Sequence, residues 1–561
     1  MINLKAKDFF IKANYWKSLI IRIFSIFLFI YIFFYFLYIN LNSNINSIDH
    51  YGLNIVIIFC YFTFLIIFNK FFNFWLFKKC YSLMMQDVKK IQKTVELPKK
   101  LPKVVYVYTT HNDFWETRLL QSMQQTYKNI EYWISDGSSN KEKIQEIKDF
   151  CKKYNVNYHS LNRPSLNKAD NLNHFLKYAK VDFDYLLISD ADIAIDKNFV
   201  STSLKFFYYN GFKRLGWVSS LLNNYWYDNW YSYISCYHGN IDYFYSLESN
   251  FNQQKSTSLH SACSLIKKEL LLDFNMKFPD SNLEDFWLEF LATRKYWKGF
   301  KNPLTISLEI YDKNIFNNFT RIFRINDWTI KLYKDHYWTN LNESNKLTNQ
   351  GLFNMVWMHP LKWIFLPILS SLIIFIFINY SNIITSHYQY LIIISCILSW
   401  IIFDFIYKII KNLNLWNWKK FHLVLLSLLI YYLYNISTFW YSSIRFFNSF
   451  FRSKYADFIT SKNISKNSKL NNLYKMRKFI ITFFSCLIIL TIFDIIFIFY
   501  KWNTLNFVLM FVFIYVNLLL SWILLSLIAF FILYSLSWIN KKTNNSKKFI
   551  YCQNEKMFGK K

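Results

Sequence analysis

The chain has 561 residues, of which 53% are hydrophobic and 22% aromatic, and its formal net charge is +30. This apolar content excludes a largely disordered chain, and several apolar runs of about 20 residues exclude an ordinary soluble enzyme. The sequence lacks the signatures Gly-x-Gly-x-x-Gly and Gly-x-x-x-x-Gly-Lys-Ser/Thr, which excludes the common dinucleotide and P-loop sites. The positive excess favours contact with anionic membrane lipid, and we expect no nucleic acid partner.

Seven apolar runs predict membrane-embedded helices, and a polar stretch with most of the prolines and glycines separates the second run from the third. The first run is long, lacks a small-residue cleavage site and is soon followed by another, so it reads as an uncleaved anchor. The runs are Leu19–Ile39, Leu53–Phe77, Leu361–Asn379, Tyr390–Ile410, Phe421–Tyr441, Phe479–Tyr500 and Leu505–Trp538.

Lysine and arginine gather near both termini, whereas the loops 40–52 and 380–388 contain none. The positive-inside rule therefore predicts a multi-pass protein of the plasma membrane with both termini and the polar domain in the cytosol. That orientation requires an even number of spans. The run Phe421–Tyr441 has basic segments on both sides, so we expect it to lie along the cytosolic interface, with a true span as the alternative.

The polar domain opens with strands alternating with helices. Apolar, β-branched runs predict strands, and helical spacing of apolar side chains predicts helices between them. The strands are Val104–Thr110, Ile130–Ser135 and Tyr185–Ser189, and the helices are Glu116–Tyr127, Asn140–Tyr154 and Lys168–Ala179. This alternation is typical of an α/β fold with a mixed, mostly parallel sheet and helices on both faces.

Polar side chains follow each predicted strand, at the edge of the sheet where ligands of such folds bind. Asp190 and Asp192 follow the third strand and can share a hard divalent cation, Mg²⁺ or Mn²⁺, that also binds phosphate oxygens. Asp136 follows the second strand and can accept a hydrogen bond from a nucleotide base. Lys168 begins a helix and can pair with phosphate. Together they predict metal-dependent handling of a nucleoside diphosphate.

The series resembles that of family 2 glycosyltransferases with a GT-A fold. A Thr-x-Asn-Glu-like segment is matched from Thr110, Asp-Asp-Gly-Ser is matched around Asp136, and Lys-Ala-Gly-x-Leu-Asn is matched from Lys168 with Asp170 at the glycine. The Asp-x-Asp motif is matched at Asp190. The resemblance implies a UDP-sugar donor bound by Thr110, Asp136, Lys168 and Asp190, with the metal on Asp192 and Asp190.

Further along, Asn282 to Asp285 matches the family's Thr-Glu-Asp segment without its threonine. The resemblance implies that Asp285 is the general base and that Glu284 lies on the acceptor side. The Gln-x-x-Arg-Trp motif of processive members fits in two registers. We favour the register in which Arg321 and Arg324 grip the diphosphate and Trp328, one turn further on, supplies an acceptor-stacking plane. The other register aligns Trp328 with the tryptophan of the motif but replaces its arginine.

The cellulose synthase-like branch of this family carries a gating loop of the form Phe-x-Val-Thr-x-Lys before its last two spans. Ile459, Thr460 and Lys462 match that pattern, although an aspartate replaces its phenylalanine. Such a loop can close over bound UDP and exclude water. Two intramembrane carboxylates, Asp404 and Asp494, are expected to line the channel for the growing polysaccharide.

The sequence therefore predicts an inverting, metal-dependent, processive synthase of a β-linked polysaccharide, a glucan or a galactan. One alternative is a non-processive enzyme that glycosylates a lipid, and another is a non-catalytic membrane assembly partner. The expected organisation is a two-helix membrane anchor (1–77), a cytosolic catalytic domain (78–320), interface helices (321–360), transmembrane helices three and four (361–410), an interface helix with a gating-loop-like segment (411–478), transmembrane helices five and six (479–540) and a basic cytosolic tail (541–561).

Overall fold

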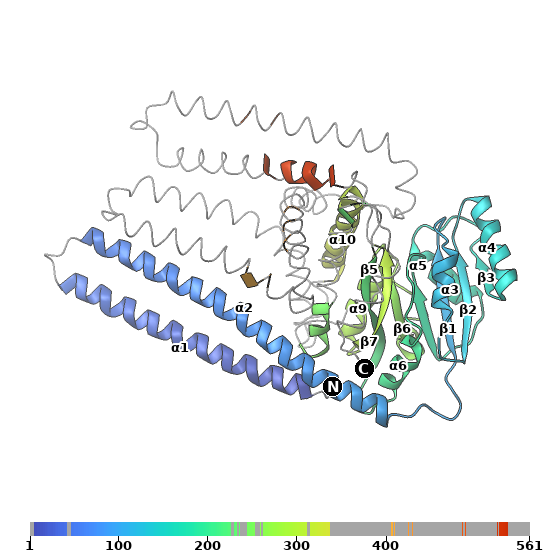
Figure 1. Cartoon of the computed structure of the whole chain (residues 1–561), viewed down its shortest axis with the longest axis horizontal. Coiled ribbons are helices and arrows are strands. Elements are labelled where there is room, and N and C mark those ends of the chain that lie inside the picture. Colours follow the sequence, from blue (N-terminus) through green and yellow to red (C-terminus); the bar gives the residue numbers. More distant parts are fainter. Residues whose placement is uncertain are drawn as a thin grey trace.

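The protein is described from a computed structural model (Figure 1). It describes residues 5–41, 47–225, 244–252, 262–310 and 315–336, with scattered positions between 229 and 259 and between 406 and 536. Two long helices extend away from a compact α/β domain, in which the strands lie side by side (Figure 1).

Seven strands form one sheet in the described part of the chain: β1 (Val104–Thr110), β2 (Ile130–Asp136), β3 (Asn157–Ser160), β4 (Tyr185–Ser189), β5 (Leu215–Tyr225), β6 (Cys263–Lys267) and β7 (Lys298–Ile310). Their order is β3-β2-β1-β4-β6-β5-β7. Strands β3, β2, β1 and β4 are parallel, β6 is antiparallel to both neighbours, and β5 is parallel to β7. The predicted mixed, mostly parallel sheet is confirmed.

Strand register brings the predicted polar residues to one edge. Thr110 pairs with Asp136 across β1 and β2, and Asp136 pairs with Ser160 across β2 and β3. On the other side of β1, Tyr108 pairs with Ser189, the residue before Asp190. Because these four strands are parallel, their carboxyl ends form a continuous edge that runs from β3 to β4.

Helices cover both faces of the sheet. They are α3 (Glu116–Ser122), α4 (Lys141–Tyr154), α5 (Lys168–Tyr178), α6 (Phe199–Phe207), α8 (Lys268–Leu272) and α9 (Glu284–Arg294). Alternate residues of β1 point to opposite faces of the sheet and so belong to different apolar cores. Tyr106 and Tyr108 belong to the core shared with α3, α4 and α6, whereas Val105 and Val107 belong to the core shared with α5, α8 and α9.

The predicted helices around α4 and α5 are confirmed to within one residue, and side-chain caps explain where they begin. The Asn140 side chain accepts from the backbone amides of Glu142 and Lys143, and Asn155, which caps the end of α4, has the left-handed conformation. Helix α3 is shorter than predicted and ends at Ser122. The Ser122 hydroxyl accepts from the Ile195 amide at 2.9 Å, so the next residues turn to the loop after β4 rather than continuing the helix.

Two long helices precede the domain, α1 (Lys5–Leu41) and α2 (Ser47–Thr94). Among the described residues, one stretch, Lys5–Ile32, has the length and apolar composition needed to cross a membrane. Helix α2 continues beyond residue 77, where the anchor was expected to end, and runs without a break to Thr94, next to the α/β domain. The other apolar runs predicted from Leu361 onward lie almost entirely outside the described residues.

The end of α2 packs against the domain through a buried apolar stripe of Leu76, Cys80, Met84, Val88 and Ile91. Polar contacts reinforce this packing. The Gln92 side chain donates to the Thr202 carbonyl at 3.0 Å, and Lys205 Nζ donates to the Gln92 carbonyl at 2.7 Å. The long helix is thus joined to α6, so the position of the domain relative to the helical segment is set by side-chain packing.

Candidate active site

The loops after β1 and β2 are joined by hydrogen bonds through Asn112. The side-chain oxygen of Asn112 accepts from the backbone amides of Ser139 and Asn140, at 3.0 and 2.9 Å. The backbone amide of Asn112 donates to Ser138 Oγ at 2.8 Å. Asn112 has a φ of 62°, a left-handed conformation that asparagine tolerates well. Thr110, which is 3% exposed, donates to Asp113 Oδ1 at 2.9 Å. These hydrogen bonds hold the loops after β1 and β2 together, and we call the surface formed by the two strand ends the floor of the candidate site.

Asp136 lies in that floor and is only 2% exposed. Its Oδ1 accepts from the Ser138 amide at 2.9 Å, and its Oδ2 accepts from the Tyr158 hydroxyl at 3.0 Å. Burial raises the pKa of Tyr158 to about 12, so this phenol remains a donor at physiological pH. The sequence pointed to Asp136 but not to Tyr158, whose strand β3 is short and carries little apolar signal.

Helix α5 is fastened to the same edge. The Asn171 side chain donates to the Ser135 carbonyl at 2.9 Å, and its carbonyl oxygen accepts from the Ser135 hydroxyl. On the opposite side of the helix, Asn173 exchanges two hydrogen bonds with the backbone of Phe278, at 3.0 and 2.7 Å. These contacts hold the start of α5, and with it Lys168, between the sheet and the segment that leads to α9.

Lys168 and Asp190 form an ion pair at the end of β4. The lysine side chain is 9% exposed and that of Asp190 is 41% exposed, so the lysine is largely buried while the aspartate faces solvent. Burial by itself would lower the pKa of Lys168, but Asp190, Glu284 and Asp285 outweigh it and the pKa rises. Lys168 therefore stays charged.

Glu284 and Asp285 begin α9 and lie close enough to Lys168 to act on its charge. Glu284 is 3% exposed, and burial together with Asp285 raises its pKa to about 7, against the opposing influence of Lys168. Asp285 is half-buried, and its Oδ1 accepts from the Phe286 amide at 2.8 Å. One carboxylate is thus buried and the next is partly exposed to solvent.

The helix α10 (Ile315–His336) brings the two predicted arginines together on one side, three residues apart. Burial and the neighbouring Arg321 lower the pKa of Arg324, while Glu284, Asp190 and Asp285 act in the opposite direction. Arg324 is therefore close to the same carboxylates as Lys168. Arg321 is more exposed, and its Nη1 lies 3.5 Å from Glu309 Oε1.

Trp328 lies one turn further along α10 and contacts α9. Its ring is 6.2 Å from that of Trp287 in an edge-on arrangement, and Lys331 Nζ lies 4.6 Å from its centroid. Together with Phe290, Ile330 and other apolar side chains they form a separate apolar cluster. Both candidate registers are compatible with this arrangement, because Arg321, Arg324 and Trp328 lie on the same helix.

Asp192 is half-buried, and its pKa is raised well above the ordinary value by burial and by Asp190, Glu309 and Asp113. Glu309 was not expected from the sequence. It comes from the end of β7, which reaches back across the sheet, because Leu308 and Ala194 form a two-hydrogen-bond bridge at 2.8 and 2.9 Å. The alternating pattern from Leu304 to Ile310 is the signal that would have predicted this strand.

Tyr108 is a second residue that sequence reasoning missed. Its hydroxyl donates to the carbonyl of Ala191, between the two aspartates, at 2.9 Å and accepts from the Trp115 amide at 3.0 Å. A buried phenol thus supports the turn that presents Asp190 and Asp192. In the sequence, Tyr108 is one residue of the apolar first strand and carries no other signal of this role.

The structure brings most of the predicted site residues to one edge of the sheet. Lys168, Asp190, Glu284, Asp285 and Arg324 influence one another electrostatically. Five predicted residues lie outside the described part of the chain, namely Asp404, Asp494, Ile459, Thr460 and Lys462.

Comparison with known families gives one match. Residues 99–273 match the family model described as Glycosyl transferase family 2, which confirms the resemblance for this segment. No curated protein matches the chain. The matched segment is similar to family 2 glycosyltransferases and makes up less than half of the chain.

Several solved structures are similar to the chain. One is the mannosyltransferase PcManGT from Pyrobaculum calidifontis in complex with GDP-Man and Mn²⁺, at 14% identity and a TM-score of 0.38, covering 49% of this chain and 77% of that one. Another is S. aureus TarS 1–349 with UDP, at 13% identity and a TM-score of 0.30, covering 45% and 71%. A third is GalNAc-T7 with UDP, GalNAc and Mn²⁺, at 13% and 0.31, covering 45% and 55%.

Proposed function

We propose that the protein is an inverting, metal-dependent, processive glycosyltransferase. The similarity of residues 99–273 to family 2 glycosyltransferases is the starting point of this proposal. The enzyme would extend a β-linked polysaccharide, a glucan or a galactan, from UDP-sugar in the cytosol and pass the polymer outward through its own membrane helices. The observation that carries the proposal is the gathering of Lys168, Asp190, Glu284, Asp285 and Arg324 at the carboxyl edge of the sheet.

The donor would lie along this edge from β2 to β4. The base would reach Asp136, and the diphosphate would reach the cations Lys168, Arg324 and Arg321. Guanidinium groups suit phosphate oxygens because they donate two parallel hydrogen bonds, whereas the lysine acts as a point charge. Arg321 holds Glu309 at 3.5 Å, so a bound diphosphate would compete with that carboxylate for the arginine.

Asp190 and Asp192 would hold the divalent cation, Mg²⁺ or Mn²⁺. The surroundings of Asp192 suit a cation, because burial and the nearby carboxylates of Asp190, Glu309 and Asp113 raise its pKa. Such a cluster of negative groups would be stabilised by a bound positive ion. Within the described residues, no group of three or more His, Cys, Asp or Glu side chains could hold a metal ion. Two carboxylates with phosphate oxygens in the remaining positions are a donor set that Mg²⁺ or Mn²⁺ accepts. When bound, the cation stabilises the negative charge of the departing diphosphate.

Asp285 would act as the general base. Its carboxylate would take the proton of the acceptor hydroxyl while that oxygen bonds to the anomeric carbon and the bond from that carbon to UDP breaks, which inverts the configuration. The neighbouring Glu284 is buried against Lys168 and would shape the local charge rather than meet the acceptor proton. Trp328 and Trp287 would offer an aromatic surface to the acceptor sugar.

Processivity and export are supported by the sequence rather than by the described residues. The apolar runs after residue 360, the gating-loop-like segment around Thr460 and the intramembrane aspartates favour a channel. In the fold, the unbroken passage of α2 into the domain supports a catalytic site held at a fixed place beside the helices. The altered Gln-x-x-Arg-Trp motif favours the second candidate, a non-processive enzyme that makes a glycolipid.

Release of UDP by the purified full-length protein would test the proposal. UDP-glucose, UDP-galactose, UDP-GlcNAc and UDP-glucuronate would be offered with Mn²⁺ or Mg²⁺, and products would be sized on a gel. Asp285→Asn should abolish release, whereas the matched change Asp182→Asn, at the opposite edge of the sheet, should not. A high-mass product with one donor supports the synthase, and a small glycolipid supports the second candidate. No release with any donor, in membranes or detergent, would refute both.

A further inference from the structure

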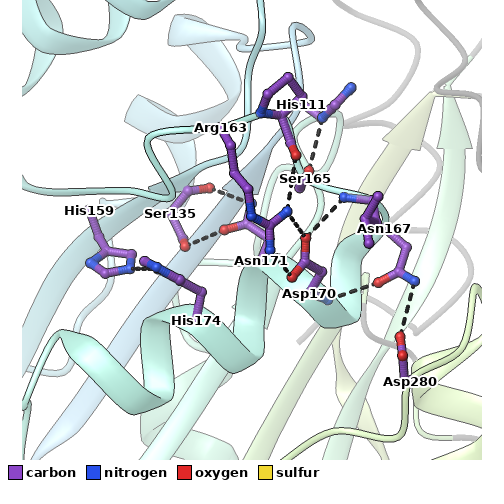
Figure 2. Close-up of polar contacts among 12 residues, drawn as sticks. His111, Ser135, His159, Arg163, Ser165, Asn167, Asp170, Asn171, His174 and Asp280 are labelled. Atoms are coloured by element: carbon purple, nitrogen blue, oxygen red, sulfur yellow. Dashed lines mark hydrogen bonds and ion pairs between the residues drawn. The ribbon is translucent and has the colours of Figure 1, made fainter.

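The segment of residues 161–167 connects β3 to α5 and lies against the carboxyl ends of β1 and β2, where Figure 2 shows Ser165 beside His111. Three contacts hold it against them. The Leu161 amide donates to the Asp136 carbonyl at 3.3 Å, and the Ser165 amide donates to the Gly137 carbonyl at 3.0 Å. The Ser165 hydroxyl lies 2.9 Å from His111 Nδ1. The segment therefore borders the floor that contains Asp136.

An ion pair closes this segment on itself. Arg163 Nη1 and Nη2 each lie 2.7 Å from a different oxygen of Asp170, a bidentate arrangement, and Asp170 Oδ2 also accepts from the Leu166 amide at 3.0 Å. The Asp170 amide donates in turn to Asn167 Oδ1 at 2.8 Å. Figure 2 shows how Arg163 reaches over the start of α5 to meet the carboxylate. The first turn of the helix is thus linked to the middle of the segment.

Asp170 stands where the family pattern has glycine, a residue that has no side chain with which to make this contact. The Arg163 hydrogen bonds lower the pKa of Asp170, so the carboxylate stays ionised. The arginine side chain is 49% exposed, and its charge is not needed to satisfy a buried group. A bidentate guanidinium–carboxylate pair adds geometric definition beyond its modest energy. The pair is therefore a feature of this chain with a defined geometric effect.

We propose that the Arg163–Asp170 pair positions residues 161–167 as the wall of the nucleotide-base end of the donor site, and so sets the affinity for the nucleoside part of the donor. This inference rests on the proposed function, which places the base at Asp136. Without the pair, the segment would sample other conformations, and binding would have to order it again. The diphosphate end would be affected little, because Lys168 is held by Asp190 and α5 by Asn171.

The two ends of the donor can be measured separately with UDP and inorganic pyrophosphate. Isothermal titration of the full-length protein, in detergent with Mn²⁺, would compare the wild type with Asp170→Asn and Arg163→Lys, the latter keeping the charge but not the fork. We expect UDP affinity to fall about 3- to 10-fold in each variant while pyrophosphate affinity is unchanged. In the transfer assay the KM for the donor should rise by the same factor at constant kcat.

Two further variants control this result. Exchanging the residues, Arg163→Asp with Asp170→Arg, should recover part of the UDP affinity. Asp182→Asn removes a 2.6 Å ion pair with Lys268 at the opposite edge of the sheet and should leave both affinities unchanged. Thermal melting would show that each variant folds, and Arg163→Lys is the milder change if Asp170→Asn fails to fold.

The outcomes separate this inference from the proposed function. Unchanged UDP affinity in both single variants would overturn the role of the pair, and so would an equal loss for UDP and pyrophosphate, which would indicate a general disturbance of α5. If the wild type binds neither probe and releases no UDP from any donor, the proposed function fails and the inference fails with it.

Discussion

Replacing Gly137 with alanine tests the closeness of the segment 161–167 to the strand ends. A Cβ at this position would lie 2.3 Å from Ser165 Oγ and 2.5 Å from Ser165 Cβ, against ordinary contacts of 3.4–4 Å. Gly137 does not have the positive φ that would by itself disfavour alanine. The effect of the substitution is therefore purely steric, and it falls on Ser165.

The size of the effect follows from the contacts that Ser165 makes. To restore an ordinary contact, the segment must move away by about 1 Å, which would lengthen the 3.0 Å hydrogen bond from the Ser165 amide beyond a useful distance. The 2.9 Å contact with His111 would be lost as well. Crowding and two lost hydrogen bonds together cost about 1–3 kcal/mol. If UDP binding needs the segment in place, UDP affinity should fall roughly 10-fold.

Titration of UDP into the full-length Gly137→Ala protein would measure this loss. The second change Ser165→Gly removes both close atoms and should restore most of the affinity in the double variant. Gly216→Ala is a matched control, because its Cβ would meet Leu270 Cδ1 at 2.3 Å in the core; it should lower the melting temperature without changing UDP affinity. Wild-type UDP affinity in Gly137→Ala, or no recovery in the double variant, would refute the reasoning.

Three further predictions concern stability, metal and acceptor. Burial lowers the pKa of Lys301 to about 8, from 10.5 in the unfolded chain, so the unfolded chain binds more protons between these values. Stability should rise with pH across that window, by up to about 3 kcal/mol, and Lys301→Met should flatten the rise in denaturation measured from pH 7 to 10. Chelation with EDTA should abolish UDP release and added Mn²⁺ should restore it; full release in EDTA would argue against a cation on Asp190 and Asp192. Trp328→Ala should shorten the product at unchanged UDP affinity, and products of wild-type length would remove the acceptor role from this ring.

The strands and helices at the start of the domain could be predicted from the sequence because their signals are local. Strand β1 has the predicted bounds, and Asp190 and Asp192 directly follow β4. Each of these elements is defined by consecutive residues, an apolar run for the strand or a cap for the helix. Because parallel strands end at the same edge, their order in the chain was enough to bring Thr110, Asp136 and Asp190 together.

The second half of the sheet depended on contacts between distant residues. Strand β6 runs antiparallel between β4 and β5, and no local pattern states which strand will be its neighbour. Glu309 reaches Asp192 only through the bridge between Leu308 and Ala194, more than a hundred residues apart. Its place near Asp190 and Asp192 therefore could not be derived from its own surroundings in the sequence.

The sequence by itself indicated the resemblance of residues 99–273 to family 2 glycosyltransferases and the chemical groups at the edge of the sheet, because strand-end residues follow their strands in every such sheet. Tertiary structure alone decided how those groups are charged and supported. The pKa of Glu284 is raised because α9 buries it beside Asp285, and the Arg163–Asp170 pair forms because α5 begins where the preceding segment folds back. Burial and proximity arise from packing in three dimensions, and residue order does not encode them locally.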